Sequence, residues 1–302
     1  MNALPTRWRL SPDSTLSRAI DGIITSPKAA IGAVVTILLV LVAVFGPWLA
    51  PQNPYDLGAI DFFDARLPPL SPSMNGSIYL LGTDGQGRDM LSAMIYGLRT
   101  SIAVGLLAGI VALVVGTALG LVAAYVGGRV DALVMRLVDL MLGLPAILVA
   151  LMLLALLGQG VWKVILALVL VQWAQFARAV RAAALVERNK EYVEAAVSLG
   201  LSRPRILFGH MLPNCLPPII VVGTLQVASA ISAEATLSFL GIGLPITEPS
   251  LGLLIANGYK VLLSGQYWIS VYPGLLLLVL VFSINVVGDR LREVFNPRFL
   301  GR

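Results

Sequence analysis

The sequence is poor in the residues that build catalytic and metal sites. Of its 302 residues, one is cysteine and one is histidine. Cys215 alone can form neither an internal disulfide nor a cysteine-based metal cluster, and His210 alone can form no histidine pair for a metal. None of the four lysines follows a glycine, so the phosphate-binding P-loop pattern is missing. If ATP drives this protein, the sequence therefore predicts that the ATPase is a different chain.

Charged residues are also scarce. Asp, Glu, Lys and Arg make up 12% of the chain, whereas soluble domains carry roughly 25%. Hydrophobic residues make up 58% of the chain, and the mean hydropathy is +0.88. These values predict an integral membrane protein. The net charge of +5 and the pI of 9.6 would also suit a nucleic-acid-binding protein, so the positions of the charges have to decide between the two.

Long uncharged runs indicate where the chain crosses the membrane. Residues 29–50 form the first run, which has about the ~20 residues that a spanning helix needs and exceeds the roughly 7–15 residues of a signal-peptide core. We therefore predict a retained first helix after a polar tail, residues 1–28. Pro51 and Pro54 are expected to end this first helix. Five more spans are expected at 100–128, 140–162, 161–183, 215–244 and 261–288, so the predicted fold is all-α with six transmembrane helices.

These spans divide the chain into a first helix, a polar segment and a core. The polar segment, residues 51–98, is rich in Pro and Asp and is expected to contain a turn at Thr83-Asp84-Gly85, followed by an amphipathic helix that enters the membrane. Its glycines resemble a phosphate-binding loop only weakly, because no strand precedes them. The core is expected at 99–290, with an outer loop at 245–260, a Y-P-G corner at Tyr272 that opens the last span, and a tail at 291–302.

The distribution of Lys and Arg predicts the orientation. One side of the six-span arrangement carries 16 of these residues, in four segments: 1–28, 125–139, 178–210 and 289–302. The other side carries 5. Because basic loops stay in the cytoplasm, both termini are expected there and residues 51–98 outside. The basic pI then follows from membrane topology, and we expect contact with lipid and none with nucleic acid.

Ionisable groups close to or inside the spans are candidates for a functional or structural role. Arg136 and Asp139 stand three residues apart at the start of a predicted helix and are expected to form an ion pair. Glu234 is the only carboxylate well inside an apolar run. It lies roughly 27 Å from the cytoplasmic end of its helix at 1.5 Å per residue, close to the outer surface. Two interpretations stay open for Glu234: packing or interface pairing, and a gate on a translocation path.

The chain is organised around a polar stretch between spans, residues 191–214. Tyr192, Ala195, Ala196 and Leu199 are spaced three or four apart, which predicts one face of a short helix. Gly200 is expected to end that helix, since glycine adopts the left-handed cap conformation without steric cost.

A second short helix is expected directly after the glycine. Ser202 is predicted to cap it, and Pro204 falls in its first turn, where a missing N–H does no harm. Two short helices hinged at a glycine would form a docking surface for another protein. An ordinary basic loop between helices is the alternative.

This stretch resembles the signature loop of ABC importer permeases. Glu194-Ala195-Ala196, then Gly200 four positions after Ala196, then Leu212-Pro213, match the order and spacing of that signature. A polar residue at His210 followed closely by Pro-Asn looks like the peptide/nickel subfamily. Further matches, including LGTDGQGRDM at 81–90 and S-F-L-G-x-G at 238–243, extend the resemblance over about residues 79–298. Leu251 departs from it, because the family often has tryptophan there.

The resemblance implies a type I ABC importer permease fold with a cytoplasmic coupling-helix loop, at residues 184–214. It implies that the loop docks on an ATPase through Glu194, Ala195, Ala196, Gly200, Ser202, Arg203 and Arg205. The implied partners are a second homologous permease, two ATPase subunits that bind the ATP and Mg, and a periplasmic binding protein, all at the bacterial inner membrane. No cofactor is expected in this chain. The implied cargo is a peptide or a related small solute such as a nickel chelate.

Two other classes of membrane protein would require features that this sequence has little of. An ion-coupled transporter that acts alone would favour ionisable groups at mid-membrane and a repeat of broken helices, whereas this chain has only Glu234, off-centre, and no evident repeat. An intramembrane enzyme would need a cluster of reactive side chains, for which one histidine, one cysteine and no paired carboxylates in the spans leave little material. We therefore expect a transport subunit and not an enzyme.

Overall fold

The computed structural model describes residues 15–56, 58, 60–73, 76 and 78–295 and consists almost entirely of helices. The remainder of the two predicted tails lies outside the described residues. Short elements in the polar segments are η1 (Phe62–Asp64), an antiparallel pair β1 (Ser71–Pro72) and β2 (Ile78–Tyr79), a π-helical segment η2 (Arg205–Met211), and η3 (Leu262–Ser264). The α-helices are α1 (Thr15–Thr25), α2 (Pro27–Leu49), α3 (Met90–Val126), α4 (Gly128–Gly143), α5 (Ala146–Leu157), α6 (Val161–Arg188), α7 (Glu191–Ser198), α8 (Leu212–Phe239), α9 (Leu251–Tyr259) and α10 (Trp268–Val294).

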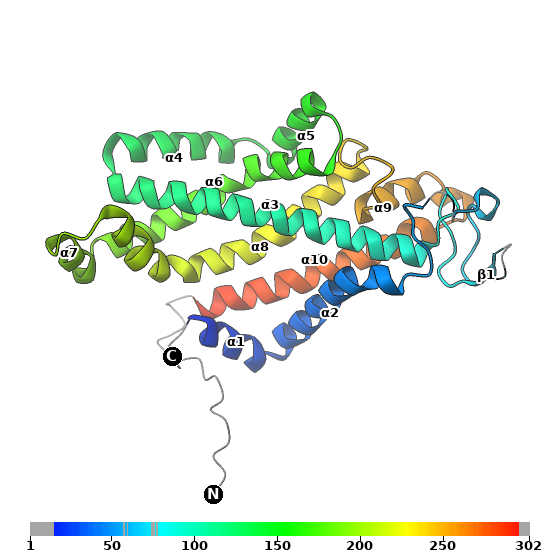
Figure 1. The fold of residues 1–302 in the computed structure, drawn as a ribbon, viewed down its shortest axis with the longest axis horizontal. Coiled ribbons are helices and arrows are strands. Elements are labelled where there is room, and N and C mark those ends of the chain that lie inside the picture. The colour runs from blue at the N-terminus through cyan, green and yellow to red at the C-terminus, as the bar shows by residue number, and fades with distance from the viewer. Residues whose placement is uncertain (1–14, 57, 59, 74–75, 77, 296–302) are drawn as a thin grey trace, which may run out of the picture.

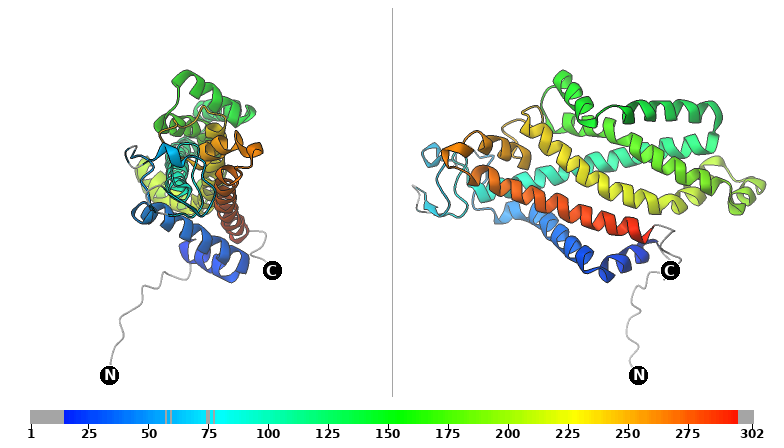
Figure 2. Two further views of the ribbon diagram at one scale, coloured as in Figure 1. Left: turned by 90° about the vertical axis from the view of Figure 1, so that its right-hand side faces the viewer. Right: turned by 180° about the vertical axis from the view of Figure 1, so that it is seen from behind.

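The long helices run side by side in an elongated bundle (Figure 1). One end of the bundle carries α7, together with α1 and the last turns of α10. The opposite end carries the β1–β2 segment and α9, and the view from behind shows the same arrangement (Figure 2). The predicted docking stretch and the predicted outer segment therefore lie at opposite ends of the molecule.

Within the described residues, five helices are long and apolar enough to cross a membrane, and a sixth span exists only if α4 and α5 are counted together. These two helices meet at an angle of 92°. The bend follows from Pro145, because the residue before a proline avoids the helical conformation, and Leu144 is extended with φ −99° and ψ 143°. The single straight third span predicted at 140–162 is therefore wrong: α5 has 12 residues, or about 18 Å, too short to cross alone.

Three other helical boundaries differ from the sequence prediction. The tail at 1–28 contains α1, which packs against α10 and α2. The outer loop at 245–260 contains α9, whose Leu251 is fully buried. The last span begins at Trp268, so Pro273 lies inside α10 and not at a corner that opens it. Helices α1 and α9 pack against long helices, including those next to them in the chain, and the sequence pattern of a short segment does not show this burial.

Hydrogen bonds and a buried ion pair hold together the polar segment before α3. The hydroxyl of Thr83 donates to the carbonyl of Asp64 and accepts from the N–H of Leu67. Asp84 and Arg88 form a buried ion pair at 2.6 Å. The predicted turn is present one residue later, since the N–H of Gly87 donates to the carbonyl of Asp84 at 3.2 Å. Gly82 and Gly87 have a structural role, because a Cβ on either would overlap the carbonyl oxygen of Leu67 or of Asp61. The predicted amphipathic helix is the first part of the continuous α3.

Ion pairs hold α4 against α6. Asp139 pairs with Arg178 and Asp131 pairs with Arg181, both on α6. The ion pair predicted between Arg136 and Asp139 is wrong, because among the described residues Asp139 instead bonds to the guanidinium of Arg178, 39 positions along the chain. The i,i+3 spacing offers a local partner, whereas the packed bundle brings a second arginine to the same carboxylate.

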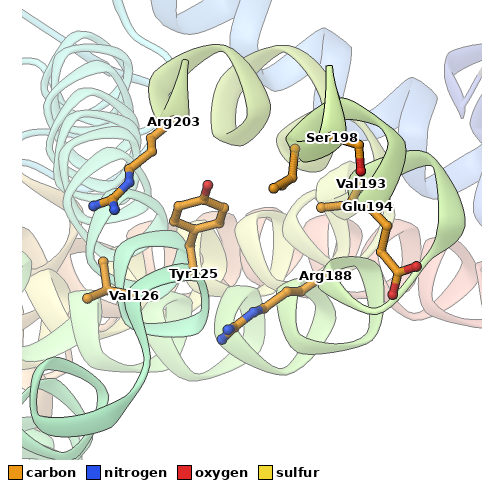
Figure 3. Close-up of a pocket in the computed structure, with 8 residues that line it drawn as sticks. Tyr125, Val126, Arg188, Val193, Glu194, Ser198 and Arg203 are labelled. Carbon is orange, nitrogen blue, oxygen red and sulfur yellow. The ribbon is translucent and has the colours of Figure 1, made fainter. Parts of the chain in front are cut away.

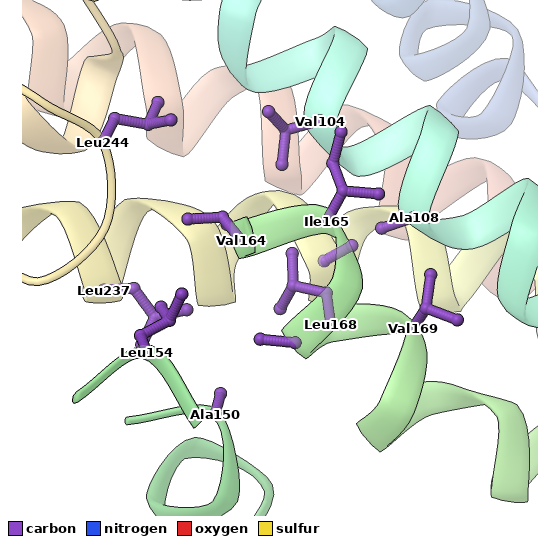
Figure 4. Packing of buried hydrophobic residues seen from close by; sticks show 12 residues of the cluster. Val104, Ala108, Ala150, Leu154, Val164, Ile165, Leu168, Val169, Leu237 and Leu244 are labelled. Atoms are coloured by element: carbon purple, nitrogen blue, oxygen red, sulfur yellow. The ribbon is translucent and has the colours of Figure 1, made fainter. Parts of the chain in front are cut away.

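Helix α3 runs through the bundle and contacts α6 along much of its length. Gly116 and Gly120 make this possible. A Cβ at Gly116 would lie 2.5 Å from the Cβ of Phe176 and would overlap the carbonyl oxygen of Trp173, and a Cβ at Gly120 would lie 2.6 Å from the carbonyl oxygen of Ala177. Small residues let membrane helices approach this closely. Beside this contact, buried aliphatic side chains of α3, α5, α6 and α8 fill the core (Figure 4).

The glycine contact generates a stability prediction. Gly116→Ala is expected to lower the free energy of unfolding by about 1–3 kcal/mol, since backbone atoms of α6 must move to admit the methyl group. The measurement is thermal unfolding of the purified protein in detergent. Gly143→Ala is the matched control, because a Cβ at Gly143 meets no atom within 4 Å. Equal melting temperatures for both variants would show that the α3–α6 contact does not limit stability.

Candidate functional site

Helix α7 presents one buried face and carries two exposed aliphatic side chains at its C-terminal end. Val193 and Ala196 are buried, and they pack in a cluster with side chains of α3, α6, η2 and α8. Leu199 is 79% exposed and Val197 is 55% exposed. Of the four residues predicted to share a face, Ala196 is buried and Tyr192 is half-buried, whereas Ala195 and Leu199 are exposed. Two large aliphatic side chains exposed on a short helix outside the bundle are a candidate contact for another protein.

Gly200 ends α7 as predicted. Its φ is +70°, and its N–H donates to the carbonyl of Val197 at 2.9 Å. The N–H of Leu201 reaches back to the carbonyl of Ala196 at 3.2 Å, which completes a Schellman cap. A Cβ at Gly200 would meet open space, so the glycine is needed here for its left-handed conformation.

The segment after Gly200 differs from the prediction. No hydrogen bond from the Ser202 side chain caps a helix within the described residues; its backbone carbonyl instead accepts from the N–H of Ile206 at 3.0 Å. The π-helical η2 continues directly into α8, so residues 205–239 form one long helix. The expected second short helix is therefore the first part of the fifth span, and α7 is joined to that span through a single turn.

A chain of hydrogen bonds anchors α7 to both neighbouring spans. Glu187, buried at the end of α6, accepts from the amino group of Lys190 at 2.7 Å and from the hydroxyl of Tyr192 at 2.6 Å. The side chain of Asn214, on α8, donates to the same hydroxyl at 3.2 Å. Burial raises the pKa of Tyr192 strongly, and its bond to Glu187 adds to this, so the phenol stays protonated as a donor. Glu187 was missed in the sequence because a carboxylate at the polar end of a span looks like an ordinary flank.

Beside α7 lies a hollow of about 540 Å³, at the same end of the bundle (Figure 3). Arg188 donates to the backbone carbonyl of Ala124 at 2.9 Å and so connects α6 to the end of α3. Of the predicted docking residues, Glu194 and Arg203 line this hollow, whereas Ala195, Gly200, Ser202 and Arg205 are exposed around it. The lining residues are Tyr125, Val126, Arg188, Val193, Glu194, Val197, Ser198 and Arg203.

Glu234 is completely buried and bonded within the protein. Its carboxylate accepts from the hydroxyl of Ser101, on α3, at 2.7 Å and from that of Ser238, one turn along α8, at 2.8 Å. The hydroxyl of Ser101 also accepts from the backbone N–H of Leu251, at the start of α9. Through these contacts Glu234 joins α3, α8 and α9 at the outer part of the bundle. The geometry favours the packing interpretation over a gate.

These observations define the class of protein. A bundle of membrane-spanning helices carries the short helix α7 at one end and the hydrogen-bonded segment before α3 at the other. The groups described above include no cluster of reactive side chains. The chain belongs to the family of binding-protein-dependent transport system inner membrane components, which it matches over residues 116–301. Residues 16–69 match the N-terminal transmembrane domain of oligopeptide transport permease C.

Individual relatives cover most of the chain. The dipeptide transport system permease protein DppC of Escherichia coli is 42% identical over 89% of this chain and 89% of its own length. The di/tripeptide transport system permease protein DppC of Pseudomonas aeruginosa is 38% identical over 90% and 88%. The structure is similar to solved inward-facing structures of the MetNI methionine ABC transporter, with a TM-score of 0.56, 20% identity, and coverage of 68% of this chain and 97% of that chain. The type I ABC importer permease fold is confirmed.

The geometry around Glu234 generates a prediction that separates packing from gating. Glu234→Ala removes the shared acceptor and leaves two buried hydroxyls with no acceptor for their protons, so the free energy of unfolding is expected to fall by about 2–4 kcal/mol. Glu234→Gln keeps an acceptor and is expected to lose less than about 1 kcal/mol and to keep transport. Thermal unfolding in detergent and uptake by the assembled importer measure the two effects. A Glu234→Gln protein with normal stability and no uptake would support the gate.

Proposed function

We propose that this chain is one permease subunit of an ATP-driven importer and forms half of the path for peptides or a related small solute. The observation that carries the proposal is α7, which is bonded to two spans and leaves the aliphatic side chains of Val197 and Leu199 exposed at one end of the bundle. The relatives named above support the cargo class, since they are described as dipeptide and di/tripeptide permeases.

The contacts around α7 suggest how force from an ATPase reaches the membrane. Glu187 binds α7 to the end of α6, and Asn214 binds it to the start of α8. Val193 and Ala196 add buried apolar contact beneath it. A partner that moves α7 would therefore move the cytoplasmic ends of α6 and α8 together, because α7 cannot turn without breaking these hydrogen bonds and the apolar contact beneath it. Both helices pack on α3, so the motion would pass into the whole bundle.

The proposal includes partners that complete the importer. Two ATPase subunits, which bind the ATP and Mg, would grip α7 and its counterpart on a second, homologous permease. A periplasmic binding protein would deliver the cargo to the end that carries β1, β2 and α9. The excess of Lys and Arg at the α7 end supports a bacterial inner-membrane location with that end and both termini in the cytoplasm.

The proposed docking face generates a direct test. Leu199→Asp is expected to weaken ATPase binding tenfold or more, because a carboxylate at an apolar contact must be desolvated without a partner. Affinity purification in mild detergent, followed by quantification of the ATPase subunit and of ATP-driven uptake, measures the effect. Leu263→Asp is the matched control, as Leu263 is fully exposed at the opposite end, in η3. Recovery of equal amounts of ATPase with both variants would refute docking through α7.

A further inference from the structure

A second hollow lies inside the membrane part of the bundle, away from α7. It has a volume of about 390 Å³ and lies between α5, α6 and α8. This volume falls within the range of roughly 300–1,000 Å³ typical of small-molecule sites. Ala150 and Leu168, which belong to the apolar core shown in Figure 4, form part of its wall. The exposed side chains of Gln175 and Ser229 lie at its margin, so the hollow opens on the surface of this chain.

Two glutamines of this hollow lie at mid-depth in the membrane. Gln172 is 11 residues from the start of α6, or about 16 Å along the helix, and Gln226 is 14 residues from the start of α8, or about 21 Å. The hydrocarbon core is about 30 Å thick. Both amides therefore lie within the hydrocarbon core. A polar side chain there is costly unless it has a partner.

Each glutamine carries one buried polar atom without a hydrogen-bond partner among the described residues. The side chains are 5% exposed for Gln172 and 6% for Gln226. The Nε2 of Gln172 donates to the backbone carbonyl of Gln226 at 3.4 Å, which leaves the Oε1 of Gln172 as a free acceptor. The Nε2 of Gln226 is a free donor.

The other polar groups of the wall are satisfied or exposed. The hydroxyls of Ser232 and Thr236 donate to backbone carbonyls one turn earlier in α8, at 2.9 and 2.8 Å. The wall contains no charged side chain and is otherwise formed by small and aliphatic residues. An ion would find no counter-charge here. A neutral group that both donates and accepts a hydrogen bond matches the two free atoms.

A peptide bond is such a group, since it offers one N–H and one C=O. We propose that this hollow is a subsite for a backbone amide of the cargo, in which the cargo N–H donates to Oε1 of Gln172 and the cargo C=O accepts from Nε2 of Gln226. The subsite rests on the proposed function and specifies its cargo as a compound that contains an amide. Recognition of the backbone alone would let peptides with different side chains pass.

The test replaces the amide of the cargo by an ester. The complete importer, with both permeases, the ATPases and the binding protein, is reconstituted in vesicles, and initial ATP-driven uptake is measured for dialanine and for alanyl-lactate, which has an ester oxygen in place of the N–H. Saturating amounts of loaded binding protein make the rates report steps after delivery. The measured quantity is the ratio of amide to ester uptake in one preparation, so any loss of folded importer cancels.

Gln172→Met is expected to reduce this ratio at least threefold by slowing dialanine and not alanyl-lactate, because only the dipeptide has an N–H to lose. Gln226→Met is expected to slow both cargoes equally, since both have the carbonyl. Gln175→Met is the control, as its amide lies at the exposed margin of the same hollow, and its ratio is expected to equal that of the unmodified importer.

Two outcomes would overturn the subsite. An unchanged ratio in Gln172→Met, with dialanine imported normally by the unmodified complex, would refute amide recognition and leave the proposed function intact. If that unchanged ratio came with slower import of both cargoes, Gln172 would have a structural role. An unmodified complex that hydrolyses ATP and imports neither cargo would refute peptide import itself, and the subsite with it.

Discussion

A carboxylate, amide or hydroxyl that is buried between membrane helices has no water to bond with, so the protein must supply its partners. This constraint governs how the bundle is assembled. Glu234 accepts from one serine hydroxyl on α3 and one on its own helix α8, and the side chain of Gln172 on α6 donates to a backbone carbonyl of α8. Because the bonds from α3 to Glu234 and from Gln172 to α8 each join two helices, these polar residues set the register of helices whose apolar surfaces could slide past one another. The close contact at Gly116 then fixes their spacing.

The same constraint makes α7 a rigid part of the permease. A short helix of eight residues is not stable alone. It is ordered by a glycine cap at one end, by Glu187 at the other, and by Val193 and Ala196 beneath. Val193 and Ala196 fill the contact with the bundle, and the side chains of Val197 and Leu199 remain exposed. A helix held this firmly can transmit a displacement, whereas a loosely attached one would absorb it.

Residue spacing predicted features that depend on neighbours within one turn, such as a helix cap. Features that depend on packing between distant segments, such as buried faces and ion pairs, were not predicted. The cap at Gly200 depends on residues within one turn, so spacing alone was sufficient. The inward face of α7 depends on where α3 and α8 lie, and spacing alone did not show that Val193 and Ala196 would form it. Asp139 shows the limit most clearly, since its partner Arg178 is 39 positions away and replaces the nearby Arg136. The bend at Pro145 could have been found from the proline, but a long apolar run concealed it.

Glu234 and the pair Gln172 and Gln226 illustrate two outcomes for polar groups in one membrane. Glu234, a group that could have been charged, has its oxygens occupied by serine hydroxyls and lies close to the outer end of its helix. The glutamines are neutral, lie at mid-depth, and keep one donor and one acceptor free beside a hollow. A fully bonded group contributes to stability, and a bound cargo would only disrupt it. An unpaired buried group destabilises the empty protein, but it forms a hydrogen bond when a molecule with a complementary group binds. A transport path needs this property, because it must hold its cargo briefly and then release it.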